Sequence, residues 1–346
     1  MSKSDYYDGT KLLSLQDANG NKPEIFICVG NRTAGKTIYF TRLCIRRFIE
    51  RKEKFAFIYR FNYELDDCAD KIFKDVKALF FPNMEMTSER RAHGIYHELF
   101  LDGESCGYAI SINQSDPLKR YAHLFSDIER ILFDEFQSES SHYCTDEVKK
   151  FISLHTSIAR GGGKSVRYVP VYMLANPVSL LNPYYVALGI TDRLKSDTKF
   201  MRGNGWVFEN TFNENASVQQ LESGFNKAFS SQKYVSYAAS GVYLNDNTAF
   251  IEKPSGRTHY LCTIKYDGRN YGIREYPDLG IVYCDDKPDK TFSSKISVTT
   301  DDHEVNYVML KRNDMFLSNL RYYFEKGCFR FKDLRCKEAV LKALSY

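Results

Sequence analysis

The eight residues from 30 to 37 constrain the fold of this chain more than any other stretch. They read G-N-R-T-A-G-K-T, which matches the P-loop pattern G-x-x-x-x-G-K-T. An apolar run at 24–29 precedes them and is typical of a buried strand, and apolar residues follow at helical spacing over 38–49. A strand, a glycine-rich turn and a helix N-terminus in this order predict an α/β P-loop NTPase domain with a mainly parallel sheet.

Each residue type in the pattern suits the binding of nucleotide phosphates. Lys36 is predicted to reach the β- and γ-phosphates, and the Thr37 hydroxyl is predicted to bind Mg²⁺. ATP and Mg²⁺ are therefore the expected ligands. Backbone N–H groups of the turn are expected to surround phosphate oxygens at the positive end of the helix dipole. They belong to Gly30, Asn31, Arg32, Thr33, Ala34 and Gly35.

A second informative stretch, I-E-R-I-L-F-D-E, spans residues 128–135. A mostly apolar strand that ends in two acids is typical of a Walker B motif. Asp134 is predicted to hold Mg²⁺, and Glu135 is placed to orient or deprotonate the attacking water. A protein that only binds nucleotide does not need the second acid, so Glu135 favours ATP hydrolysis.

Two residues farther along the chain are candidates for completing the site. Arg160 leads into a glycine-rich loop and could act as an arginine finger on a neighbouring nucleotide, although a helix cap is an equal alternative. Lys164 and Arg167 compete for the same role. Asn176 ends the apolar strand 169–175, where it could sense the γ-phosphate or simply begin a turn.

Composition excludes several classes of protein. The net charge of 48 − 44 = +4 shows no global basic excess, so any nucleic-acid binding requires a local patch. The nine cysteines include no C-x-x-C pair, which argues against a zinc site and a secreted disulfide framework. No apolar run approaches the ~18 residues of a membrane span, and residues 1–5 are too polar for a signal peptide. We expect a reducing cytosol and no membrane.

The remaining segments predict the domain organisation. Residues 94–101 and 107–112 predict a β-hairpin. Residues 54–60 predict a second strand that ends in Arg60, which is either a surface arginine or a residue that contacts nucleotide or a neighbouring subunit. The polar stretch 206–241 predicts a helical linker or lid. Residues 258–284 predict an antiparallel meander, followed by a long helix over 304–326. We therefore predict domains at 1–205 and 242–346.

Taken together, these motifs resemble the genome-packaging motor ATPase of small podophages. The resemblance is carried by the P-loop, F-A-F-I-Y-R, I-L-F-D-E-F and L-A-N-P-V-S-L-L-N-P-Y, in that order. It implies a ring, expected to be a homopentamer, that docks on the phage portal in the host cytoplasm and pumps double-stranded DNA into a procapsid. It also implies that Arg160 acts in trans and that Asn176 couples hydrolysis to movement. A packaging RNA is a candidate partner.

The same resemblance guides the interpretation of DNA contacts and of the C-terminal domain. Lys119 and Arg120, in the polar loop before the Walker B strand, are candidates for binding DNA phosphates. In larger terminase relatives the C-terminal domain is an RNase H-like nuclease with an acid on its first strand. The equivalent strand here, 259–265, has none, and the acid pairs 285–286 and 301–302 are expected in loops.

We therefore expect a small α+β, vestigial nuclease domain that docks on portal or nucleic acid and has no nuclease activity. Three alternatives to a packaging motor stay open at this point. They are another P-loop nucleic-acid motor such as a helicase, a nucleotide-gated scaffold, and an active nuclease.

Overall fold

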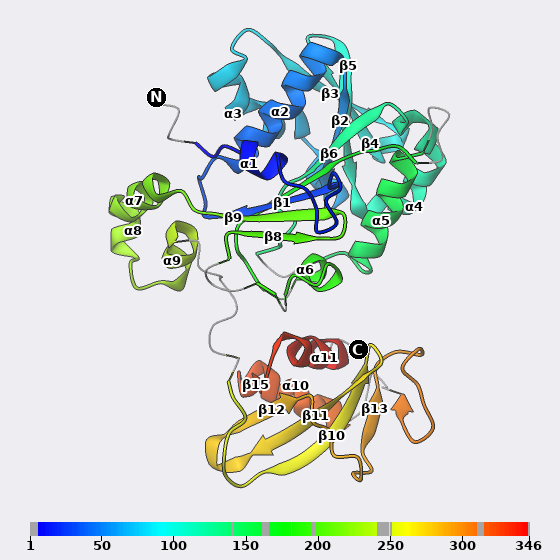
Figure 1. The fold of residues 1–346 in the computed structure, drawn as a ribbon, viewed down its shortest axis with the longest axis vertical. Coiled ribbons are helices and arrows are strands. Elements are labelled where there is room, and N and C mark those ends of the chain that lie inside the picture. The colour runs from blue at the N-terminus through cyan, green and yellow to red at the C-terminus, as the bar shows by residue number, and fades with distance from the viewer. Residues whose placement is uncertain are drawn as a thin grey trace. The chain divides into compact units, whose positions relative to one another are not determined.

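The computed structural model divides the chain into two compact units, Met1–Leu244 and Asn245–Tyr346. The structure describes residues 6–139, 142–160, 166–180, 182–191, 193–194, 198–240, 249, 251–309 and 315–344. Figure 1 shows an α/β first unit and a smaller α+β second unit. Within the described residues, no helix combines the length and apolar character needed to cross a bilayer.

The first unit is built on a nine-stranded sheet with the order β3-β4-β5-β2-β6-β7-β1-β9-β8. The six strands from β5 to β9 in this order are parallel, and antiparallel pairs extend both edges. β7 lies between β1, which leads into the P-loop, and β6, which carries Walker B. The strands are β1 (Ile25–Gly30), β2 (Lys54–Tyr59), β3 (Met86–Arg91), β4 (Tyr96–Leu101), β5 (Glu104–Ser111), β6 (Ile128–Phe133), β7 (Val171–Ala175), β8 (Phe200–Gly203) and β9 (Trp206–Thr211).

Helices cover both faces of this sheet, as continuous apolar runs in parallel strands require (Figure 1). Alternate residues of β1 enter different cores: Phe26 packs with α2, and Ile27 packs on the side of α5. The predicted α/β fold with a mainly parallel sheet is confirmed. The helices are α1 (Thr10–Leu13), α2 (Lys36–Arg51), α3 (Cys68–Phe80), α4 (Ser115–Leu118), α5 (Glu147–Ile158) and α6 (Pro183–Ala187).

The hairpin and the linker differ in how well the sequence predicted them. β4 and β5 pair antiparallel across Asp102 and Gly103, which both have positive φ, so the hairpin is present, and β5 also joins the main sheet. Residues 206–211 are not a linker but form β9 beside β1. Their side chains are largely buried in that sheet. The polar residues that follow them in the sequence led to the prediction of a linker. Three helices follow: α7 (Glu214–Glu222), α8 (Gly224–Ala228) and α9 (Lys233–Ser240).

The second unit has a six-stranded sheet with the order β14-β13-β10-β11-β12-β15. The predicted meander is present as β10 (His259–Tyr266), β11 (Arg269–Tyr276) and β12 (Ile281–Asp285). The single helix expected over 304–326 is wrong: residues 308–309 form β14, and the helix described there is α10 (Met315–Glu325). The other elements are β13 (Lys295–Ser297), β15 (Phe329–Phe331) and α11 (Leu334–Leu344).

Candidate nucleotide-binding site

A cleft of about 410 Å³ lies at the carboxyl ends of β1, β6 and β7. Parallel strands present their carboxyl ends at one edge of the sheet, which is where open α/β sheets bind ligands. The residues predicted to bind and hydrolyse nucleotide therefore meet in one place. The cleft is lined by Tyr6, Arg32, Thr33, Ala34, Gly35, Lys36, Thr37, Ile38, Asp75, Asp134, Glu135, Ala175 and Asn176.

The P-loop turns tightly from β1 into α2. Gly35 has a φ of +93°, which L-residues rarely adopt, and a Cβ atom there would lie 2.9 Å from the Tyr6 ring. α2 begins at Lys36, and no side chain caps its N-terminal N–H groups. These N–H groups are therefore available to an anion at the positive end of the helix dipole.

The Lys36 side chain is buried beneath the turn and joins it to β7. Its ammonium donates to the carbonyl oxygens of Gly30 and Asn31, both at 2.9 Å, and lies 3.4 Å from Asn176 Oδ1. Desolvation lowers the pKa of Lys36, and the nearby Asp134 opposes this shift. The predicted P-loop lysine and the predicted sensor asparagine are therefore neighbours.

The Thr37 hydroxyl donates to Asp134 Oδ2 at 2.6 Å, although 97 residues separate them in sequence. Desolvation raises the pKa of the Asp134 carboxyl, and the bond from Thr37 partly offsets the rise. Mg²⁺ prefers oxygen ligands and commonly takes one or two from protein, with phosphates and waters completing its shell. The described residues contain no cluster of three or more His, Cys, Asp or Glu side chains for a metal. A hydroxyl and one carboxylate thus fit Mg²⁺ that arrives with a nucleotide.

Glu135 follows Asp134 with a left-handed backbone, at a φ of +54°. Its own N–H donates to Asp134 Oδ1 at 2.9 Å, which orients the two acids relative to each other. Desolvation in the cleft, together with the charges of Asp134 and Glu139, raises the pKa of the Glu135 carboxyl. A carboxylate with a raised pKa is a better proton acceptor, as a general base requires.

Arg160 and Arg167 lie near the amino end of β6, away from the cleft at its carboxyl end. Arg160 follows α5 and is exposed. Arg167 is engaged locally: it pairs with Glu129 at 3.1 Å and donates to the carbonyl oxygens of Ile128 and Ile158. Because Ile128 begins β6 whereas Asp134 follows its end, this region is remote from the protein's own nucleotide cleft. Lys164 lies outside the described residues.

The candidate DNA contacts also lie outside the cleft. Lys119 and Arg120 begin a 3₁₀ segment, Lys119–Phe125, and both are exposed. Lys119 pairs with Asp116 at 2.8 Å within the same surface segment. Their proposed role in binding DNA phosphates stays a prediction.

The sequence did not reveal that the P-loop is bound to the helices α7 and α9. The fully buried Asn31 side chain donates to the carbonyl oxygens of Asn213 and Ala239 and accepts from the Asn213 N–H. Arg32 forms an ion pair with Glu139, which also accepts a hydrogen bond from Tyr237 of α9 at 2.7 Å. The helical segment 214–240 is thus hydrogen-bonded to the P-loop.

The interpretation of Arg60 as a surface residue was wrong. Its side chain is 8% exposed and forms a buried ion pair with Glu147. The sequence placed Arg60 at the end of a predicted strand, but nothing in the sequence around Glu147 indicated that it pairs with Arg60.

Comparison with known proteins identifies the family. A family model described as "Podovirus DNA encapsidation protein (Gp16)" matches residues 1–344. The DNA packaging protein of Bacillus phage phi29 is 26% identical over 337 residues, which cover 96% of this chain and 94% of the relative. The corresponding protein of Bacillus phage B103 is 24% identical over 324 residues, covering 92% and 94%.

Solved structures give a similar fold. A chain of the bacteriophage Phi-29 viral genome packaging motor assembly superposes with a TM-score of 0.62 at 24% identity, covering 99% of this chain and 98% of that one. A chain of the Phi-28 gp11 DNA packaging motor gives 0.62 at 16% identity, covering 99% of both. From the match along nearly its whole length, the chain belongs to the podovirus DNA encapsidation protein (Gp16) family.

Proposed function

We propose that this protein is an ATP-driven translocase that packages double-stranded DNA into a preformed viral procapsid in the infected cell. One observation carries the proposal. Lys36, Thr37, Asp134 and Glu135 converge on a single cleft, in a chain that matches a DNA encapsidation family along nearly its whole length. Encapsidation moves a polymer against resistance and needs an energy source, which a hydrolytic P-loop site supplies.

Each residue of the cleft has a separate role in the proposed hydrolysis. Mg²⁺ held by Thr37 and Asp134 would neutralise charge on the bound phosphates. Lys36 binds phosphate oxygens from beneath the turn, and Glu135 accepts a proton from the attacking water. The Asn176 amide lies beside the Lys36 ammonium, so loss of the γ-phosphate after hydrolysis would change the charge next to that amide.

A ring of identical subunits is supported by the position of Arg160; its pentameric state and its docking on the portal are what the resemblance to packaging motors implies. α5 has 12 residues, so at roughly 1.5 Å per residue it carries the chain about 18 Å away from its own Walker B acids. Arg160 therefore cannot serve its own γ-phosphate without rearrangement, and we assign it to a neighbouring subunit's site. Arg167 is a weaker candidate because its guanidinium is already engaged.

The contacts to DNA are assigned to Lys119 and Arg120, which are exposed cations. Such contacts to phosphates are independent of sequence and weaken as salt is added. A packaging RNA is a further candidate partner, and its addition to the packaging assay tests that directly.

The second unit is assigned to docking on portal or nucleic acid, without nuclease activity. Two of the acids considered as nuclease ligands have structural partners. Asp285, which ends β12 and does not lie in a loop as expected, forms a buried ion pair with Arg274, and Asp302 accepts the N–H groups of Asp267 and Gly268. A two-metal nuclease needs carboxylates that converge on the ions. The pairing with Arg274 leaves Asp285 poorly suited to that task.

The test is an ATPase and DNA-protection assay with purified portal-bearing procapsids. We expect duplex DNA together with procapsids to raise turnover, and the packaged DNA to become resistant to added nuclease. Glu135→Gln should abolish both effects. Stimulation by single strands alone would indicate a helicase, and turnover at background with every polymer would refute the proposal.

A further inference from the structure

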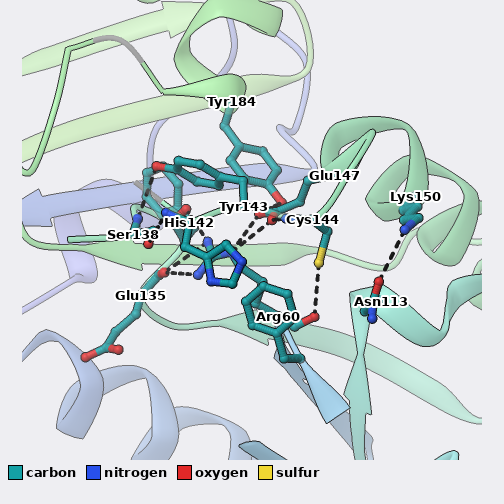
Figure 2. Close-up of polar contacts among 12 residues, drawn as sticks. Arg60, Asn113, Glu135, Ser138, His142, Tyr143, Cys144, Glu147, Lys150 and Tyr184 are labelled. Atoms are coloured by element: carbon teal, nitrogen blue, oxygen red, sulfur yellow. Dashed lines mark hydrogen bonds and ion pairs between the residues drawn. The ribbon is translucent and has the colours of Figure 1, made fainter. Parts of the chain in front are cut away.

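Arg60 lies at the end of β2, where its guanidinium contacts both the Walker B loop and the start of α5 (Figure 2). Nε donates to both carboxylate oxygens of Glu147, at 2.9 and 3.1 Å. Nη2 donates to the carbonyl oxygen of Phe136 at 2.8 Å, and both terminal nitrogens lie 3.4 Å from the carbonyl oxygen of Glu135. One rigid side chain therefore contacts two consecutive carbonyls of the loop that carries the catalytic acid.

Glu147 is well suited to hold Arg60 in place. Its carboxylate is 1% exposed, and besides Arg60 it accepts the Cys144 N–H at 2.8 Å and the Tyr184 hydroxyl at 2.9 Å. A buried charge costs a great deal of free energy unless it is paired and hydrogen-bonded. With these partners, the carboxylate has one position available, and the planar guanidinium aligned on it has few alternatives.

The backbone that Arg60 contacts is strained. Glu135 is in the left-handed region, at a φ of +54°, which costs a non-glycine residue roughly 1–2 kcal/mol. Such conformations persist only where the surroundings enforce them. Here the Phe136 N–H donates to the Leu174 carbonyl oxygen at 3.1 Å on one side of the loop, and Arg60 binds its carbonyls on the other.

Figure 2 shows the consequence for the catalytic side chain. The Glu135 carbonyl faces Arg60, and the Glu135 carboxylate points away from that cluster. The same residue lines the cleft that contains Lys36 and Thr37. The direction of the carboxylate thus depends on a backbone conformation that Arg60 helps to hold.

We propose that Arg60 is a positioning residue for hydrolysis, which acts by holding the carbonyls of Glu135 and Phe136 while Glu147 anchors its guanidinium. The inference rests on the proposed ATPase function and adds a residue that touches neither nucleotide nor metal. Because Glu147 is the first residue of α5 and Arg160 follows the last turn of that helix, the same ion pair joins the catalytic loop to the element carrying the proposed finger.

The decisive variant is the double substitution Arg60→Met with Glu147→Gln. It removes both buried charges together, so no unpaired ion remains. The glutamine oxygen keeps an acceptor for the Cys144 N–H, and its NH₂ group can donate to the Tyr184 hydroxyl oxygen. Replacing a buried ion pair by uncharged groups of similar volume is often neutral for stability. The melting temperature should therefore stay close to wild type, while the carbonyls of the loop lose their donor.

Two readouts separate positioning from a merely structural role. We expect kcat to fall by about 10²-fold, the low end of what a positioned general base contributes, while KM for ATP changes little. We also expect faster amide hydrogen exchange at residues 135–137 in the nucleotide-free protein, with no change in α2.

The chain offers a matched control. Arg130 and Glu53 form another largely buried arginine–glutamate pair, at the other end of β6 and β2. Arg130→Met with Glu53→Gln makes the same chemical change away from the cleft, and kcat and exchange at 135–137 should stay at wild-type values. Arg60→Lys keeps the cation but loses the planar guanidinium, and we expect about a tenfold loss of kcat, because an ammonium group does not hold the Glu147 carboxylate and both carbonyls as the guanidinium nitrogens do.

Several outcomes would overturn the proposal. It fails if the Arg60 and Glu147 double variant has wild-type kcat and exchange, or if the control pair lowers kcat equally. If the double variant does not fold, Arg60→Lys decides, and wild-type turnover in that variant refutes the positioning role. A wild-type protein with no ATPase activity would instead refute the proposed function, while the exchange comparison still tests whether Arg60 holds the loop.

Discussion

Replacement of Asn31 by alanine should release the helical segment 214–240 from the P-loop. The Asn31 amide is fully buried and makes three hydrogen bonds: it donates to the carbonyls of Asn213 at 3.0 Å and Ala239 at 3.3 Å, and it accepts the Asn213 N–H at 2.9 Å. Asn213 immediately precedes α7, and Ala239 lies within α9. One side chain therefore holds both ends of the segment to the turn.

The size of the effect follows from those three bonds. At about 1 kcal/mol net for each hydrogen bond, Asn31→Ala should weaken docking of the segment by about 3 kcal/mol. Since 1.36 kcal/mol corresponds to a factor of ten, opening of the segment should become about 10²-fold more frequent. The sheet keeps its own hydrogen bonds, so global stability should change less.

Amide hydrogen exchange measures this directly. We expect protection in α7 and α9 to fall by about that factor, with β1, β6 and β7 unaffected. The control is Gln220→Ala, which removes a single exposed hydrogen bond from Gln220 Nε2 to Thr33 Oγ1 and should have almost no effect. Unchanged protection in Asn31→Ala, or an equal loss in the control, would show that the buried amide does not hold the segment.

Three further predictions concern the chemistry. Lys36→Ala should abolish binding of a fluorescent ATP analogue, because the buried ammonium is the cation beneath the phosphate-binding turn; binding at wild-type affinity would contradict this. Glu135→Gln should keep binding but lower turnover by about 10²-fold or more. Because the pKa of Glu135 is raised in the folded protein, the stability of the wild type should fall as pH increases above the ordinary value of 4.5. Melting curves from pH 4 to 8 should show this decrease in the wild type and not in Glu135→Gln. Arg160→Ala should spare nucleotide binding yet stop hydrolysis in the assembled ring, and mixing it with Glu135→Gln subunits should restore part of the activity; normal turnover by Arg160→Ala rings would exclude the finger role.

Local patterns in the sequence determined the elements that form the candidate nucleotide-binding site. An apolar strand followed by G-N-R-T-A-G-K-T has few structural solutions, because the glycines and the helix N-terminus must surround an anion. The strand that ends in Asp134 and Glu135 is equally local. The order of the central strands then brings Thr37 to within 2.6 Å of Asp134, as the two motifs together predicted.

Only the tertiary structure decided how the supporting residues are used. Arg60 and Glu147 are 87 residues apart, and Asn31 and Asn213 are 182 apart, so no local pattern links them. Residues 206–211 begin the stretch 206–241 that was predicted to be a linker, yet they form a strand because β1 offers an edge to pair with. Phosphate binding depends on consecutive backbone groups and is readable from neighbouring residues, whereas the burial of a charge or an amide depends on partners that only the folded chain supplies.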